Sequence, residues 1–177
     1  MTLTKADIDR IGVVIPTLNE GQTLTDIIKG VRPYASDVVV VDGHSTDNTA
    51  EVASSLRTRI VLDHKKGKGE AIRTVIPHLT REVTVFIDAD GSHDPEDIPA
   101  IVKPILDGNA DHVSGSRLIG GSSELYGGFD DCFRLMGSSL ITACIRTTPS
   151  VFERMVVSML QFGWSWRKAR TRSATLT

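Results

Sequence analysis

Short runs of Val and Ile alternate with amphipathic stretches along the chain, and this alternation limits the fold more than any other feature. The apolar runs, such as "VVVV" at residues 38–41, have no polar residue at every second position. Such strands are typical of parallel sheets covered on both faces by connecting helices. We predict strands at residues 11–16, 37–42, 59–62, 83–88 and 110–117. The expected fold class is therefore α/β, with a mostly parallel sheet flanked by helices in a single domain.

Helices are predicted in the stretches between these strands. Residues 23–31 carry four apolar side chains at helical spacing, Leu24, Ile27, Ile28 and Val31. After the fourth strand, Asp94 is expected to cap a helix that has Pro95 at its first position, which accounts for Asp94 without any ligand. Further helices are predicted at residues 47–56 and at about 69–79.

Composition excludes several classes of function. With 177 residues and a formal net charge of −2, the chain has the length of one soluble domain and lacks the basic excess typical of nucleic-acid binding. The first ten residues lack the apolar core of a signal peptide, and no apolar run reaches the ~20 residues of a membrane span. The two cysteines, Cys132 and Cys144, are expected to be buried thiols in a reducing compartment. We therefore expect a cytoplasmic protein, either free or peripheral at the cytoplasmic face of a membrane.

Polar residues and glycines follow each predicted strand. In open parallel sheets, ligands bind beyond the carboxyl ends of the strands, so these segments are expected to form one rim. In chain order the segments are "PTLNE", "DGHSTDNT", "DHKKGKGE", "DADGSHD" and "SGSR". Each of them, taken alone, is also explained as a turn or a solvated run of charges. Together they predict that carboxylates, glycines and lysines converge at one edge of the sheet.

Two carboxylates, Asp88 and Asp90, lie where the fourth strand is expected to meet solvent. Carboxylates this close repel each other, and a divalent cation removes that cost. Mg²⁺ and Mn²⁺ prefer such oxygens, and proteins hold them with one or two carboxylates together with phosphate oxygens and water. The pair therefore predicts a Mg²⁺ or Mn²⁺ site that neutralises a diphosphate, which suits a diphosphate leaving group.

A phosphate-binding segment is predicted around Lys68. Gly67 and Gly69 allow the backbone to approach a phosphate closely, and the lysine supplies positive charge; a solvated charge run is the alternative. The first strand is not followed by G-x-G-x-x-G, and the chain has no G-x-x-x-x-G-K-[ST], so a Rossmann dinucleotide site and a P-loop are not supported. Zinc-ligand spacings of Cys and His, and the nucleophile elbow G-x-S-x-G, are also absent from the sequence.

Five segments together resemble a known family. The set "VVIPTLNE", "VVVDGHSTDNT", "KKGKGEAIR", "FIDADGSHDPEDI" and "SGSRLIGGS" looks like the family 2 glycosyltransferases of the GT-A fold, and more narrowly like the dolichol-phosphate or polyprenyl-phosphate mannose and glucose synthases. The resemblance covers residues 11–145 and implies a Rossmann-like GT-A domain, a GDP-mannose or UDP-glucose type of donor, and a D-x-D metal site at Asp88 and Asp90. It also implies donor-binding positions at Pro16, Leu18, Glu20, Asp42, Lys68, Ala89 and Arg117.

The resemblance implies a metal-assisted transfer of a hexose to a polyprenyl or dolichyl phosphate with inversion, in which Asp90 and Arg117 are the expected catalytic residues. A phosphate nucleophile is already ionised near neutral pH, so it needs no strong general base. Transfer to a hydroxyl of a polysaccharide or a phosphoglycerate is the alternative. It would need a carboxylate base, for which the candidates are Glu124, Asp130 and Asp131. A nucleotide-sugar-binding module with an incomplete acceptor site is the second alternative.

Residues 146–177 depart from the family pattern. The family continues with an acceptor-side segment around an S/N-G-F-R motif, which this stretch does not match. The stretch is basic, with Arg167 and Lys168 near Trp164 and Trp166, a mixture that suits an anionic membrane surface; a truncated or frayed terminus is the alternative. We therefore expect a nucleotide-sugar-binding domain at residues 1–145 and an atypical basic tail at residues 146–177.

Overall fold

The computed structural model describes residues 2–64, 67–115, 156–159 and 173–176, and the structural statements below concern these residues. The chain forms two compact units, Met1–Pro99 and Ala100–Thr177. The boundary that we predict near residue 145 stays a prediction. Both cysteines, Cys132 and Cys144, lie outside the described residues, as does most of the predicted tail.

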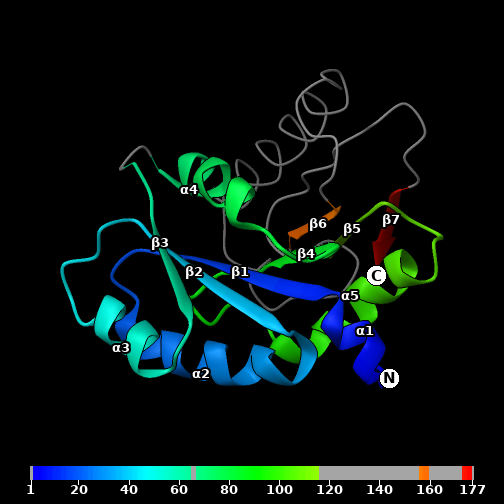
Figure 1. The fold of residues 1–177 in the computed structure, drawn as a ribbon, viewed down its shortest axis with the longest axis horizontal. Coiled ribbons are helices and arrows are strands. Elements are labelled where there is room, and N and C mark those ends of the chain that lie inside the picture. The colour runs from blue at the N-terminus through cyan, green and yellow to red at the C-terminus, as the bar shows by residue number, and fades with distance from the viewer. Residues whose placement is uncertain (1, 65–66, 116–155, 160–172, 177) are drawn as a thin grey trace, which may run out of the picture. The chain divides into compact units, whose positions relative to one another are not determined.

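Four parallel strands form the sheet of the first unit. These strands are β1 (Ile11–Thr17), β2 (Asp37–Asp42), β3 (Arg59–Leu62) and β4 (Val83–Phe86). Within this unit they lie in the order β3-β2-β1-β4, so the chain starts in the middle of the sheet and adds strands on both sides (Figure 1). The register places Val14 of β1 between Val39 of β2 and Phe86 of β4. The predicted α/β fold with a parallel sheet is thereby confirmed.

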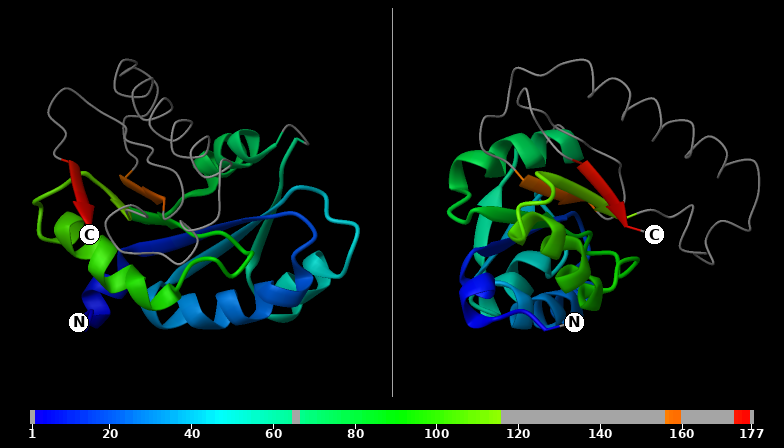
Figure 2. Two further views of the ribbon diagram at one scale, coloured as in Figure 1. Left: turned by 180° about the vertical axis from the view of Figure 1, so that it is seen from behind. Right: turned by 90° about the vertical axis from the view of Figure 1, so that its right-hand side faces the viewer.

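Helices cover both faces of this sheet. Helices α2 (Gly21–Val31) and α3 (Thr49–Ser55) lie on one face, and α4 (Lys68–Val75) lies on the other (Figures 1 and 2). The four apolar side chains predicted on one face of α2 are all buried: Leu24, Ile27, Ile28 and Val31. Each such side chain contributes roughly 1.5–3 kcal/mol when it leaves water, so this face holds α2 on the sheet.

Strand β3 differs from the expectation that all strands are covered on both faces. Its side chains are mostly exposed, with Ile60 37% and Leu62 56% accessible, whereas every residue of β1 is buried. The cause is its place in the sheet, because within the first unit β3 is the edge strand beside β2. A run of four apolar-rich residues has the same appearance in the sequence whether it becomes an edge or a centre strand.

Several predicted boundaries move by a few residues. The fourth strand ends at Phe86, so Asp88 and Asp90 lie in the following loop. The predicted helix at 69–79 is α4 followed by the short 3-10 helix η2 (Ile76–His78), and η1 (Arg32–Tyr34) similarly extends α2. An additional short helix, α1 (Lys5–Asp9), was not predicted, although Thr4 and Asp7 form its capping box.

Asp94 caps the next element as predicted. Its Oδ1 accepts from the backbone N of Glu96 at 2.9 Å, at the start of the 3-10 helix η3 (Pro95–Asp97). In the same unit, η3 packs closely against α2. A Cβ added to Gly30 would stand 2.8 Å from Cγ of Pro95, so this contact requires a glycine on α2.

The second unit contains most of α5 (Ile98–Leu106) and the strands β5 (His112–Gly115), β6 (Val156–Met159) and β7 (Ser173–Leu176). Strand β5 pairs in parallel with β7, with His112 opposite Ser173. His112 is buried, and burial lowers the pKa of its imidazole to about 4, so it is neutral at physiological pH. In the described part of the chain, no helix combines the length and the apolar character needed to span a bilayer.

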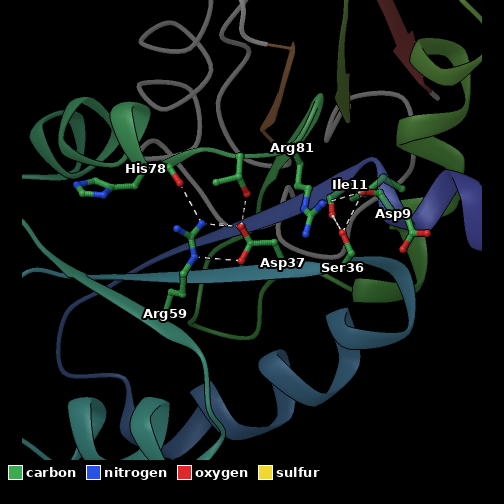
Figure 3. Close-up of polar contacts among 8 residues, drawn as sticks. Asp9, Ile11, Ser36, Asp37, Arg59, His78 and Arg81 are labelled. Carbon is green, nitrogen blue, oxygen red and sulfur yellow. Dashed lines mark hydrogen bonds and ion pairs between the residues drawn. The ribbon is translucent and has the colours of Figure 1, made fainter.

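The amino ends of β2 and β3 are joined by a compact polar cluster (Figure 3). Asp37 accepts from Nε and Nη2 of Arg59 at 3.1 and 2.5 Å, and from Oγ1 of Thr80 at 3.0 Å. Arg59 also donates from Nη2 to the backbone oxygen of His78 at 2.9 Å. This cluster, which we name the amino-edge cluster (Asp37, Arg59, His78 and Thr80), ties the edge strand to the loop before β4.

Candidate active site

The carboxyl ends of the strands in the first unit place polar side chains at one edge of the sheet. Thr17 ends β1 and pairs with Asp42, which ends β2, and Asp42 pairs in turn with Leu62 of β3. The loop after β4 then brings Asp88 and Asp90 to the same edge, since all four strands run in the same direction. The predicted rim is therefore present for the four segments that follow β1 to β4.

The loop after β1 is bonded to the loop after β2. The backbone N of Glu20 donates to Oγ1 of Thr49 at 3.0 Å, and the N of Gly21 donates to Oδ2 of Asp47 at 3.2 Å. Gly21 is needed here, because an added Cβ would stand 2.1 Å from Oδ1 of Asn48. These bonds fix the backbone that carries the Glu20 carboxyl group.

A second set of bonds holds the tip of the same two loops. The backbone N of Asn19, a residue with φ of 58°, donates to Oγ of Ser45 at 2.9 Å. The side-chain Oδ1 of Asn19 accepts from the backbone N of Thr46 at 2.7 Å. Ser45 donates to Oδ1 of Asp42 from both N and Oγ, at 2.9 and 2.6 Å. Asp42 is buried, and in this structure its Oδ1 holds the turn after β2. The predicted contact of Asp42 with a nucleotide stays a prediction.

Three contacts position the Asp88–Asp90 loop. The backbone N of Asp88 donates to Nδ1 of His93 at 3.2 Å, which fixes the imidazole beside the loop. Ala89 is buried, and its backbone oxygen accepts from Oγ1 of Thr23 on α2 at 2.5 Å. Asp90 is exposed and accepts on Oδ1 from the N of Ser92 at 2.9 Å. The loop is thus held at the residue between the two carboxylates.

Lys68 forms an ion pair with Asp88, from its Nζ to Oδ1. Lys68 is the first residue of α4 and follows Gly67, which caps the helix with φ of 86°. The Asp88 side chain is nearly buried, at 12% exposed, whereas that of Lys68 is 39% exposed. The lysine thus approaches the acidic loop from solvent, and two predicted site residues, 20 positions apart, are brought together.

Three carboxylates influence one another at this edge. Burial raises the pKa of Glu20, and the negative charges of Asp90 and Asp88 raise it further, against the nearby Thr17 hydroxyl and the charge of Lys68. Partial burial opposes ionisation of Asp90, but hydrogen bonds from Ser92 and the positive charge of Lys68 hold its pKa below the usual value. The potential at the cluster is therefore negative at Glu20 despite the lysine.

These residues fit a divalent cation. Asp88 and Asp90 offer hard oxygen ligands, and the ammonium group of Lys68 shows that a cation is already attracted to Asp88. Within the described residues, His, Cys, Asp and Glu form no group of three or more suited to a metal. A pair of carboxylates is smaller than such a group, and Mg²⁺ or Mn²⁺ commonly takes its remaining ligands from phosphate and water.

The other predicted positions are placed as follows. Pro16 is buried in β1, and Leu18 is 57% exposed in the loop that follows; their predicted contacts with the donor stay predictions. Arg117, the second expected catalytic residue, lies outside the described residues. The candidate bases for a hydroxyl acceptor also lie outside them, namely Glu124, Asp130 and Asp131.

Sequence reasoning missed the residues that support the site. Thr23 was read only as the start of a helix, and His93 was not singled out at all. Asp47 lies two residues before α3, although the helix is predicted from residue 47, and its bond to Gly21 links two loops. The signal for Thr23 is its place in the first turn of a helix that follows a rim segment, because helical side chains are directed back toward the amino end.

Comparison with known proteins adds the family. Residues 12–160 match the profile of glycosyl transferase family 2. An uncharacterised glycosyltransferase of Mycobacterium tuberculosis is 38% identical over 109 residues, which are 62% of this chain and 49% of that protein. The UDP-N-acetylglucosamine–dolichyl-phosphate N-acetylglucosaminyltransferase of Methanococcus voltae is 26% identical over 130 residues, 61% of this chain and 52% of that protein.

A solved structure has the same fold. Glucosyl-3-phosphoglycerate synthase of Mycobacterium tuberculosis, crystallised with UDP, matches with a TM-score of 0.60 and 28% identity over 78% of this chain and 50% of the other. The same enzyme has also been crystallised with Mn²⁺, UDP and glucosyl-3-phosphoglycerate. The chain spans about half the length of these relatives. Since the family profile covers well over half of the chain and the fold is that of the GT-A transferases, the protein belongs to glycosyl transferase family 2.

Proposed function

We propose that this protein transfers a hexose from a UDP- or GDP-linked sugar to the phosphate of a polyprenyl or dolichyl lipid, with a divalent metal at Asp88 and Asp90. The observation that carries the proposal is the acidic loop after β4, with Lys68 bound to Asp88 and Glu20 in the field of both carboxylates. Support for the donor comes from the neighbour crystallised with UDP and Mn²⁺. Support for the acceptor comes from the dolichyl-phosphate enzyme among the relatives.

The side chains of this site have separate tasks in such a reaction. A divalent ion, when bound, supplies positive charge that neutralises the departing nucleoside diphosphate. Asp88 and Asp90 would hold it, and the Thr23 bond to Ala89 keeps the two carboxylates in place. Lys68 adds a further positive charge where negative charge grows on the diphosphate, and Arg117 is proposed to add another. Glu20 is proposed to accept hydrogen bonds from the donor nucleotide.

The acceptor needs little activation in this scheme. Its phosphate oxygen is ionised near neutral pH, so it attacks the anomeric carbon opposite the diphosphate without a strong general base. Attack from the opposite side inverts the anomeric configuration. The basic stretch with Trp164 and Trp166 is proposed to contact the membrane that holds such a lipid, at the cytoplasmic face.

A matched pair of variants tests the metal site and the transfer. Asp90→Asn removes one charge from the proposed site, whereas Asp94→Asn removes the same charge from a helix cap, where Asn also caps well. We expect Asp90→Asn to abolish Mn²⁺-dependent transfer from UDP-glucose or GDP-mannose to polyprenyl phosphate, and Asp94→Asn to retain it. Equal activity of both variants with the unsubstituted protein would remove this site from the proposal.

Transfer to a hydroxyl group is the second candidate, because the solved structure with 28% identity is a glucosyl-3-phosphoglycerate synthase. A hydroxyl acceptor requires a base, so substituting Glu124, Asp130 and Asp131 together should then abolish transfer. Product analysis with polyprenyl phosphate and 3-phosphoglycerate offered in parallel separates the two acceptors. Binding of UDP or GDP with Mn²⁺ but no transfer to either acceptor would instead indicate a donor-binding module.

A further inference from the structure

Each member of the Lys68–Asp88 ion pair has a second proposed partner: a divalent ion for Asp88 and the donor diphosphate for Lys68. Lys68 Nζ contacts Oδ1 of Asp88, the carboxylate that is also proposed to hold a metal. The charge of the same ammonium group favours ionisation of both Glu20 and Asp90, although burial raises the pKa of Glu20 overall, so the lysine lies within the field of the whole acidic cluster. In this structure Lys68 therefore serves as the positive charge of a site that is built for cations.

A lysine and a divalent ion cannot share this carboxylate without cost. Both are positive, and like charges a few ångström apart repel strongly where a carboxylate is nearly buried, as the Asp88 side chain is at 12% exposed. Binding of a divalent ion to Asp88 therefore favours displacement of the ammonium group. Glu20 and Asp90 are the other carboxylates of the cluster, but an ion at Asp88 would repel the ammonium group from them as well.

The backbone on either side of Lys68 is open, because glycines flank it. Gly67 precedes it with φ of 86°, a conformation that glycine adopts without strain. No described atom lies within 4 Å of the point where a Cβ would stand at Gly67 or at Gly69. The lysine side chain is itself 39% exposed and has a long flexible stem. The contact with Asp88 is thus made by a flexible, partly exposed side chain at the start of α4.

We propose that Lys68 is an exchangeable counter-ion, which holds Asp88 while the site has no divalent ion and passes to the donor diphosphate when ion and nucleotide bind together. This inference rests on the proposed metal site at Asp88 and Asp90. It assigns Lys68 two opposite effects: the lysine weakens binding of the ion alone, and it strengthens binding of the nucleotide. The ion and the nucleotide are therefore coupled through Lys68, and by linkage each raises the affinity for the other.

The opposite signs of these two effects provide the test. Calorimetric titration of the full chain with Mn²⁺ alone, and then with UDP and with GDP at saturating Mn²⁺, is compared for the unsubstituted protein and Lys68→Met. We expect Lys68→Met to bind Mn²⁺ alone at least about fivefold more tightly and to bind the preferred nucleotide at least about fivefold more weakly, the low end of typical coupling. Lys68→Arg keeps the charge and should show neither tightening of Mn²⁺ nor a loss of that size for the nucleotide.

The outcomes separate the inference from the proposed function. If Asp88→Asn removes Mn²⁺ binding, the metal site is supported. If Lys68→Met then leaves Mn²⁺ binding unchanged or weakens it, the proposed exchange of Lys68 between Asp88 and the diphosphate is wrong. Failure of the unsubstituted protein and of Lys68→Met to bind Mn²⁺, with or without nucleotide, would overturn both. Circular dichroism and the thermal midpoint of each variant establish that it is folded, and a purely structural role of Lys68 predicts weaker binding of both ligands.

Discussion

The two ends of the four-stranded sheet in the first unit use the same kinds of side chain for different purposes. In the amino-edge cluster, the Asp37 carboxylate receives two bonds from Arg59 and one from Thr80 (Figure 3). At the carboxyl rim, Lys68 pairs with Asp88, and its charge also acts on Glu20 and Asp90. One acid with one base is balanced within the fold, whereas three acids around one lysine leave an excess of negative charge that a bound cation would neutralise.

The comparison also concerns the shape of the cations. Arg59 grips both oxygens of Asp37 with its planar guanidinium, a geometry that fixes the partner. Lys68 contacts Oδ1 of Asp88 as a point charge on a flexible stem. A bidentate arginine suits a permanent link between β2 and β3, and a lysine suits an exchangeable contact. Charge balance and the choice of base thus both distinguish the structural end of the sheet from the end where binding is proposed.

The largest expected effect is a loss of Mn²⁺ affinity at the carboxyl rim that has no counterpart at the amino-edge cluster. Asp88→Asn should weaken Mn²⁺ binding by at least about a hundredfold, more than the loss of a supporting residue usually costs, since a ligand itself is removed. Asp37→Ala should leave Mn²⁺ binding unchanged and lower the free energy of unfolding by about 1–2 kcal/mol, a value reduced by the partial exposure of Arg59. Calorimetry and urea denaturation measure the two quantities. An equal loss of Mn²⁺ affinity in both variants would refute the division.

A smaller effect is expected at the support between α2 and the acidic loop. Thr23→Val has the same shape but cannot donate to the oxygen of Ala89, so the loop between the two carboxylates loses its anchor. We expect Mn²⁺ affinity to fall by about tenfold, as for supporting residues of metal sites. Thr23→Ser keeps the hydroxyl group and should restore binding. If Val and Ser bind Mn²⁺ equally, the bond does not position the site.

The smallest effect is a pH dependence of stability at the rim. The pKa of Glu20 is raised above its ordinary 4.5 in the folded protein, so folding favours the protonated form. The stability that this group contributes is therefore fully present below pH 4.5, and it is lost as the pH rises through the pKa of the folded state. Glu20→Gln removes the charge, so the change that it causes in the free energy of unfolding should be more favourable at pH 7 than at pH 4. Urea denaturation at the two pH values measures the difference. A variant that is equally or more destabilised at pH 7 would contradict the raised pKa.

Much of the fold was predictable because its signals are local. The apolar runs of β1 and β2, and the helical spacing of Leu24, Ile27 and Ile28, describe elements whose burial depends on their own residues. The Asp94 cap and the position of Asp88 and Asp90 directly after a strand are equally local. The exposure of β3 was not predictable, because it depends on the order of the strands in the sheet.

The chain sequence by itself thus determined the strand and helix pattern, the family and the acidic pair after the fourth strand, since these depend on residues within one or two elements. Only the tertiary structure decided which distant groups meet that pair. Lys68 reaches Asp88 from 20 residues away, and Thr23 reaches Ala89 from 66 residues away. The physical reason is that parallel strands bring the ends of separate loops to one edge, and no local pattern specifies which side chains face one another there.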